Sequence, residues 1–302
     1  RLEVSLDKAR QAIMTIAQNF GVSIEEAALG IYRIVNAHMV QAIQAMTIRK
    51  GIDPRDFTMV AFGGAGGQHA AEVATEVGIE TILVPPRPST FSAFGLLTAD
   101  MKNSVSRTLM WRLSELSGSD LNKVLNELKM RASKFLENED ENIISMEVGF
   151  SLDVRYLGQS NEVTVALNSE RPFSKQRIYS EFQDRHQELY GTRLSDPAEI
   201  VNAQATVTGV VRPLEIATSS KSVNKPKSEH RRKLVMYPRS VPVFDRGGLG
   251  YGMLLRGPCI VEEEDSAFFM PRSASAVVDV YGNLIINTNS KSPKIRKQPT
   301  AR

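Results

Sequence analysis

The chain has 302 residues, 42% hydrophobic and 24% charged, and its formal net charge is +3 at pH 7. These values are typical of a globular protein of two or three domains, and so small a charge gives no reason to expect a nucleic-acid or membrane partner. The single cysteine, Cys259, excludes an intrachain disulfide, and no apolar stretch approaches the roughly 20 residues of a membrane span, so we expect a cytoplasmic protein.

Two helices are predicted at the start of the chain, over 5–20 and 23–46. Each begins at a serine suited to cap a helix, and Glu26 completes a capping box with Ser23. Because the chain begins at Arg1 and enters a helix almost at once, we expect it to be part of a larger polypeptide. In the second helix an apolar stripe with helical spacing predicts a core-facing side. This stripe consists of Ala27, Ile31, Ile34, Val35, Met39, Ile43 and Met46.

A glycine-rich loop follows, between a short apolar strand at 58–62 and a helix at 67–78. A second apolar strand covers 80–84, so the order strand, helix, strand predicts a parallel βαβ unit. Four glycines within five positions leave the loop without Cβ atoms, which permits positive φ and a close approach to a ligand. These glycines are Gly63, Gly64, Gly66 and Gly67.

The loop leads into a helix N-terminus, whose free N–H groups and positive dipole end suit a phosphate group. No Lys-Ser/Thr pair follows the glycines, so the loop is not a Walker A motif, and its spacing misses the dinucleotide fingerprint. The alternative is a tight strand–helix turn that binds nothing. His69, in the first turn of the helix, could contact a phosphate, ligate a metal or cap the helix.

The rest of the chain changes from mixed to mostly β structure. We expect helices at 119–139 and 175–190, and His186 on a solvent-exposed face of the latter. The acidic run 262–265 is interpreted as a solvated turn, and Cys259 as an inert thiol in an apolar strand. The expected strands are 146–157, 163–167, 200–211 and, after a polar segment, 241–244, 258–261, 267–270, 276–280 and 284–286.

Several ordered blocks resemble the hydantoinase A/5-oxoprolinase family, which includes the ATP-dependent ketone carboxylase subunits. The resemblance covers nearly the whole chain, and the blocks occur in the same order as in the family. They are Gly51-x-Asp53-Pro54-Arg55-Asp56-Phe57, Phe62-Gly63-Gly64-Ala65-Gly66, His69-Ala70, Ser92-Ala93-Phe94-Gly95-Leu96-Leu97-x-Ala99-Asp100, Asp153-x-Arg155-Tyr156-x-Gly158-Gln159, His186-x-x-x-Tyr190-Gly191, Gly257-Pro258-Cys259-Ile260-Val261-Glu262 and Val278-Asp279-x-Tyr281-Gly282-Asn283-Leu284.

The resemblance implies an α/β fold: the second half of an actin-like (ribonuclease H-like) ATPase core, followed by an α+β, β-rich C-terminal domain. The family's N-terminal phosphate loop has no counterpart here, so the chain resembles the C-terminal part of such a protein. The expected ranges are 1–112 for the half ATPase domain, 113–217 for an α+β domain, 218–230 for a linker, 231–290 for a β-rich segment and 291–302 for a disordered tail.

By the same resemblance, ATP with Mg²⁺ would bind along Gly63, Gly64, Ala65, Gly66 and Gly67, with His69 as a candidate metal ligand. The implied activity is ATP-dependent hydrolysis of a cyclic amide, after phosphorylation of its carbonyl oxygen. The alternatives are a ketone carboxylase subunit and a non-catalytic interaction module. No catalytic residue is implied.

The implied partners are the missing N-terminal half and a hydantoinase B-type subunit or domain, forming a hetero-oligomer, and we expect this chain alone to be inactive. Gly67-Gln68 is similar to the oxoprolinase branch of the family. The proline-rich segment 85–90 and the run 92–97 are similar to the hydantoinase branch.

Overall fold

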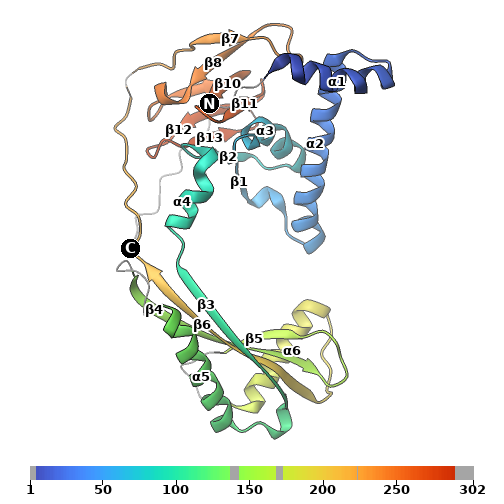
Figure 1. Ribbon diagram of the computed structural model, residues 1–302, viewed down its shortest axis with the longest axis vertical. Helices are drawn as coiled ribbons and strands as arrows, with labels where there is room; N and C mark the ends of the chain where they lie inside the picture. Colours follow the sequence, from blue (N-terminus) through green and yellow to red (C-terminus); the bar gives the residue numbers. More distant parts are fainter. Residues whose placement is uncertain (1–4, 137–142, 168–172, 223, 290–302) are drawn as a thin grey trace. The chain divides into compact units, whose positions relative to one another are not determined.

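The computed structural model describes residues 5–136, 143–167, 173–222 and 224–289. The chain forms two compact units (Figure 1). The first contains the residues up to Leu96 together with those from Glu215 onward, and the second is Leu97–Leu214. In the described part of the chain, no helix is both long enough and apolar enough to cross a membrane.

A five-stranded sheet lies at the centre of the first unit, in the order β1-β2-β13-β12-β9. Strands β1 (Thr58–Val60) and β2 (Thr81–Val84) are parallel and are joined by helix α3 (Gly66–Val77), so the predicted βαβ unit is confirmed. Strand β13 (Leu284–Asn287) pairs antiparallel with β2 and continues the sheet. The remaining strands are β12 (Ser275–Val278) and β9 (Leu254–Arg256), both antiparallel to their neighbours.

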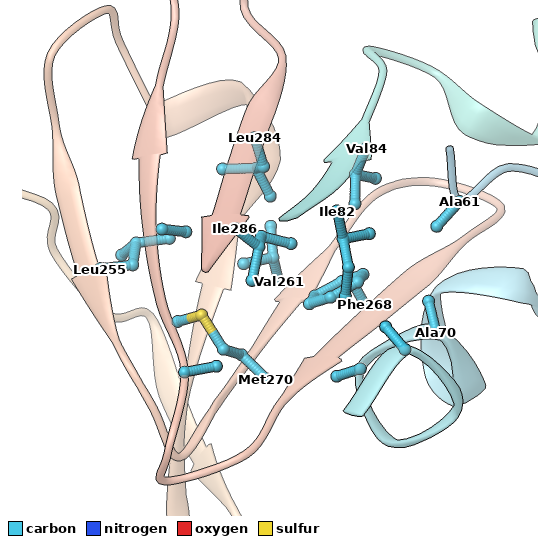
Figure 2. Packing of buried hydrophobic residues seen from close by; sticks show 14 of the residues in the cluster. Ala61, Ala70, Ile82, Val84, Leu255, Val261, Phe268, Met270, Leu284 and Ile286 are labelled. Atoms are coloured by element: carbon cyan, nitrogen blue, oxygen red, sulfur yellow. The ribbon is translucent and has the colours of Figure 1, made fainter. Parts of the chain in front are cut away.

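A second sheet of the first unit has the order β11-β10-β8-β7. Its strands are Ala267–Met270, Cys259–Glu262, Val241–Asp245 and His230–Arg232. Figure 2 shows side chains of both sheets and of α3 meeting in one core, with Phe268 and Val261 facing Ile82 and Ile286. On α3 the buried residues are small, chiefly alanines such as Ala70, so the helix can lie close to β11.

Helices α1 (Leu6–Phe20) and α2 (Ile24–Met46) have the predicted caps, including the complete capping box of Ser23 and Glu26. The prediction that the apolar stripe of α2 faces the core holds only in part. Ala27 is buried and Ile43 packs against the core of the first unit, but Ile34 and Met46 are 59% and 63% exposed. Asn36 and Val40, outside the predicted stripe, are buried, and the Asn36 side chain bonds to His69 and Glu72 of α3.

The second unit contains an antiparallel sheet in the order β3-β6-β4-β5, with strands Met101–Arg112, Ala198–Val211, Ile143–Tyr156 and Val163–Leu167. Helices α5 (Gly118–Leu136) and α6 (Lys175–Tyr190) cover one face (Figure 1). The sequence did not predict β3, an edge strand in which exposed residues alternate with partly buried ones. The short helix α4 (Phe91–Leu97) precedes it.

His186 does not lie on a solvated face of α6, as expected. It is 6% exposed, its Nδ1 lies 2.8 Å from the carbonyl oxygen of Thr192, and its ring packs edge-on against Tyr156. The polar neighbours of His186 in sequence suggested a surface, but at helical spacing it shares the inner face with Ile178 and Phe182.

The boundaries of the two compact units differ from those of the expected ranges 1–112, 113–217 and 231–290. Strand β3 belongs to the sheet of the second unit, and the late strands belong to the sheets of the first. The expected tail 291–302 lies outside the described residues. The expected linker 218–230 is attached to the first unit by three backbone hydrogen bonds, donated by Ser219 to Val280, Ser222 to Tyr251 and Glu229 to Val243.

Replacing Ile286 by alanine tests whether the late strands belong to the first core. Ile286 is fully buried, whereas its neighbour Ile285 points to the other, partly exposed side of β13. We expect Ile286→Ala to lower the free energy of unfolding by about 2–5 kcal/mol, as for other large-to-small core changes. Ile285→Ala should cost less. Urea unfolding followed by circular dichroism measures both, and equal losses would contradict the placement.

Candidate functional site

The glycine loop, residues 62–65, connects β1 to the N-terminus of α3, as predicted. Gly63 has φ +85°, a conformation that favours glycine, and its N–H donates to the carbonyl oxygen of Pro88 at 2.7 Å. Ala65 occupies the N-cap position of α3, and no side chain caps the helix. Gly66 and Gly67 are the first two residues of the helix itself.

The glycines of the loop and helix start are required for different reasons. A Cβ on Gly67 would lie 2.8 Å from the carbonyl oxygen of Ala267 on β11, so this glycine permits the close packing of α3. A Cβ on Gly64 would lie 3.3 Å from the carbonyl oxygen of Asp265. Gly66 differs, because a Cβ there would meet no atom within 4 Å. The absence of a side chain at Gly66 therefore keeps space open in front of the helix.

Four successive backbone N–H groups at this helix start are available to a ligand. Among the described residues, none accepts a hydrogen bond from the N–H of Gly64, Ala65, Gly66 or Gly67. The first N–H groups of a helix have no partner within the helix, and together with the helix dipole they favour an anion. The arrangement fits a phosphate group, whose oxygens accept several such bonds.

His69 lies in the first turn of α3 and is held by α2. Its Nδ1 is 2.7 Å from Asn36 Oδ1, and its ring stacks on Tyr32 with centroids 5.0 Å apart. Asn36 Nδ2 donates to Glu72 at 2.9 Å, which fixes the orientation of the amide. Nδ1 of His69 therefore donates the hydrogen bond to Asn36 Oδ1.

The described ranges contain no group of three or more His, Cys, Asp or Glu side chains placed to hold a metal ion. His69 as a metal ligand stays a prediction, which would require further ligands from ATP or from another chain. Cys259 is fully buried, and burial raises the pKa of its thiol to about 12, which agrees with the predicted inert thiol.

Two residues beside the loop were missed by the sequence analysis. The Arg246 guanidinium and the Glu263 carboxylate approach to 3.4 Å, with side chains only 10% and 14% exposed. Burial lowers the pKa of Arg246 to about 10, so it is still a cation at neutral pH, and burial raises the pKa of Glu263. The interpretation of 262–265 as a solvated turn is therefore wrong for Glu263, although Glu264 and Asp265 are exposed.

Arg246 also brings positive charge beneath the glycine loop. Its Nη2 donates to the carbonyl oxygens of Val84 at 3.1 Å and Gly282 at 2.7 Å, but Nη1 is buried and has no hydrogen-bond partner among the described residues. Arg246, Gly63 and Gly67 line the same cavity of about 10 Å³. The local sequence does not indicate that Arg246 lies beside the loop, because about 180 residues separate the two in the chain.

Comparison with known proteins gives a consistent result. Residues 1–105 match the family described as hydantoinase/oxoprolinase. An uncharacterized protein of Methanocaldococcus jannaschii is 34% identical over 94% of this chain and 41% of its own length. Caprolactamase subunit alpha of Pseudomonas jessenii is 32% identical over 85% of this chain and 38% of its length. The chain thus spans about two fifths of these curated relatives.

Solved structures support the α/β fold. The crystal structure of the ATP-dependent caprolactamase from Pseudomonas jessenii superposes with a TM-score of 0.73 and 29% identity, covering 94% of this chain and 43% of that one. A nucleotide-free acetone carboxylase structure gives a TM-score of 0.75 at 18% identity, over 95% of this chain and 43% of that one, which shows a shared fold. The mixed α/β architecture predicted from the sequence is confirmed.

The different roles of Gly66 and Gly67 predict opposite effects of alanine on stability. Gly67→Ala inserts a Cβ against the backbone of β11, so we expect it to cost about 1–3 kcal/mol of the free energy of unfolding, as overpacking does. Gly66→Ala adds a Cβ in open space and should be neutral or stabilise by up to about 1 kcal/mol. Denaturant unfolding of the two variants measures this difference, and a stable Gly67→Ala would contradict the close packing of α3.

Proposed function

Because the chain belongs to the hydantoinase/oxoprolinase family, we propose that it is the C-terminal portion of an ATP-dependent enzyme that opens a cyclic amide. The observation that carries the proposal is the row of unbonded N–H groups from Gly64 to Gly67, set at a helix N-terminus above a buried arginine. The caprolactamase relative is described as ATP-dependent and acts on a cyclic amide, which supports the same chemistry here.

In this proposal, residues 63–67 bind the phosphate groups of ATP. The open space at Gly66 admits a phosphate, the N–H groups donate to its oxygens, and the positive charge of Arg246 adds to the potential at the helix start. ATP would supply the phosphoryl group that converts the amide carbonyl oxygen into a leaving group. The part of this chain is positioning and charge stabilisation, the main protein contributions to phosphoryl transfer.

Partners are part of the proposal. The chain spans about two fifths of its relatives, and their names include a "subunit alpha" and, for the acetone carboxylase of Xanthobacter autotrophicus, a "beta subunit". We therefore expect the rest of the polypeptide and a second subunit, of hydantoinase B type, to complete the active site. Mg²⁺ would accompany ATP, and His69, in the first turn of α3, is the candidate ligand that this chain would offer it.

The second candidate is a ketone carboxylase subunit, which would use the same nucleotide site with a different acceptor. The observation that favours it is the sequence similarity to the acetone carboxylase beta subunit of Xanthobacter autotrophicus, 23% identical over 89% of this chain. The geometry of the glycine loop is compatible with both reactions, since both begin with ATP. A non-catalytic module of the same fold would bind partners without turnover.

The substitution Gly66→Val tests the nucleotide site. A Cβ at this position has open space around it, so we expect the fold to be retained, and the two methyl groups of valine would occupy the space in front of the N–H groups. In the complete enzyme we expect the affinity for Mg-ATP to fall by at least about 100-fold, roughly the 3 kcal/mol of several lost hydrogen bonds to a charged group. Calorimetric titration measures the affinity, with Gly66→Ala as the smaller control; an unchanged affinity would show a turn without a ligand.

The substrate is tested by phosphate release from Mg-ATP by the complete enzyme with its partner subunit. The panel is caprolactam, 5-oxoproline, hydantoin, N-methylhydantoin, and acetone or acetophenone with bicarbonate. We expect stimulation by a cyclic amide, with ring-opened product in equal amount. Stimulation by a ketone alone would favour the carboxylase. No turnover with any compound would leave the non-catalytic module.

A further inference from the structure

We propose that the buried pair of Arg246 and Glu263 positions the glycine loop, and that through this loop it sets the affinity for the phosphate groups of the nucleotide. The two residues would contact neither nucleotide nor substrate and would act as positioning residues. The inference rests on the proposed function for its ligand, but each connection from the pair to the loop is made by contacts within the first unit.

The first connection runs from Glu263 to Arg87. Oε2 of Glu263 accepts a hydrogen bond from the backbone N–H of Arg87, with an N···O distance of 3.1 Å. Arg87 has φ +51°, a left-handed conformation that is costly for a residue with a side chain. Such a conformation persists where surrounding groups hold it in place. Glu263 is one of those groups, and Arg246 in turn fixes the carboxylate of Glu263 at 3.4 Å.

The second connection runs from Arg87 to the glycine loop. Pro88 is the next residue in the chain, and its carbonyl oxygen accepts the N–H of Gly63 at 2.7 Å. Gly63 is itself in a left-handed conformation, with φ +85°. The orientation of the peptide group after Pro88 depends on the backbone of Arg87, so holding Arg87 also holds the first residue of the loop.

The third connection comes from the same acidic turn, two residues after Glu263. Oδ2 of Asp265 accepts the hydroxyl of Ser89 at 2.5 Å, which holds the proline-rich loop at a second point. The carbonyl oxygen of Asp265 lies close to Gly64, where an added Cβ would be 3.3 Å away. The turn thus contacts the proline-rich loop and the glycine loop together.

The far end of the pair is anchored in the rigid part of the unit. Nη2 of Arg246 donates to the carbonyl oxygens of Val84, at the end of β2, and of Gly282, in the turn before β13. The planar guanidinium fixes these contacts and the approach to Glu263 in one geometry. Without Glu263, the buried cation would lose its partner and the turn would reorganise around it.

A matched pair of variants separates positioning from a general effect of charge. Glu264 is the next residue in the same turn, is exposed, and makes no hydrogen bond or ion pair with any of the described residues. Glu263→Ala and Glu264→Ala therefore remove the same charge and the same side-chain atoms. The first breaks the connection to Arg87 and Arg246, whereas the second leaves it intact.

The experiment uses the complete enzyme with its partner subunit. For Glu263→Ala we expect the Kd for Mg-ATP, measured by calorimetry, to rise about tenfold or more, because the strained backbone conformation of Arg87 is no longer held in place. For Glu264→Ala the Kd should rise less than about twofold. Amide hydrogen exchange should become faster in peptides covering 62–70 for Glu263→Ala only. Exchange in the peptide covering α5, in the other unit, should not change.

The proposal would be overturned if both variants changed the Kd for Mg-ATP and the loop exchange equally. It would also be overturned if Glu263→Ala kept the Kd and the loop exchange of the unmutated enzyme. If Glu263→Ala does not fold, Glu263→Gln replaces it. This variant keeps the size of the side chain but removes the charge that pairs with Arg246, so it should also speed exchange in the loop, and unchanged exchange there would count against the proposal. If the unmutated enzyme binds no Mg-ATP, the proposed function fails, and loop exchange alone decides whether the pair positions the loop.

Discussion

The antiparallel pairing of β13 with β2 is the contact on which the arrangement of the first unit depends. It joins strands about 200 residues apart in sequence and converts the short parallel pair β1–β2 into a five-stranded mixed sheet. A two-stranded sheet is too small to be stable alone, and burial of Ile82 and Ile286 on one face provides the missing core. The same pairing brings Gly282 and Arg246 to the end of β2, next to the glycine loop.

Burying an arginine at that place has a cost and a use. The charge is compensated by Glu263 and two carbonyl oxygens, which leaves Nη1 without a partner in the described part of the chain. A buried cation near a helix N-terminus raises the positive potential at the N–H groups of the loop, where the dielectric screening is weak. The combination of an open helix start and a fixed cation behind it is suited to a multiply charged anion. A turn that only reverses the chain direction needs neither.

Both units leave large apolar side chains exposed. In the second unit, α5 and α6 cover one sheet face, while Met130 of α5 and Leu189 of α6 are exposed. In the first unit, large apolar residues of α1 and α2, among them Phe20 and Ile34, are exposed. Contiguous exposed apolar surface is typical of protein contact sites, and the chain spans about two fifths of the length of its curated relatives.

The sequence by itself determined the local elements: the capped helices, the βαβ unit, the glycine loop and the family are all recorded in short-range patterns, because caps, periodicity and glycine content act within a few residues. The sequence did not predict the edge strand β3, the burial of His186 or the exposure of most of the apolar stripe of α2, because each depends on what packs against it. The tertiary structure alone assigned Arg246 and Glu263 to the site. The two residues meet because strands far apart in the chain pair with one another. The sequence around an arginine or an acidic turn does not indicate which loop its side chain will contact or where its charge will act.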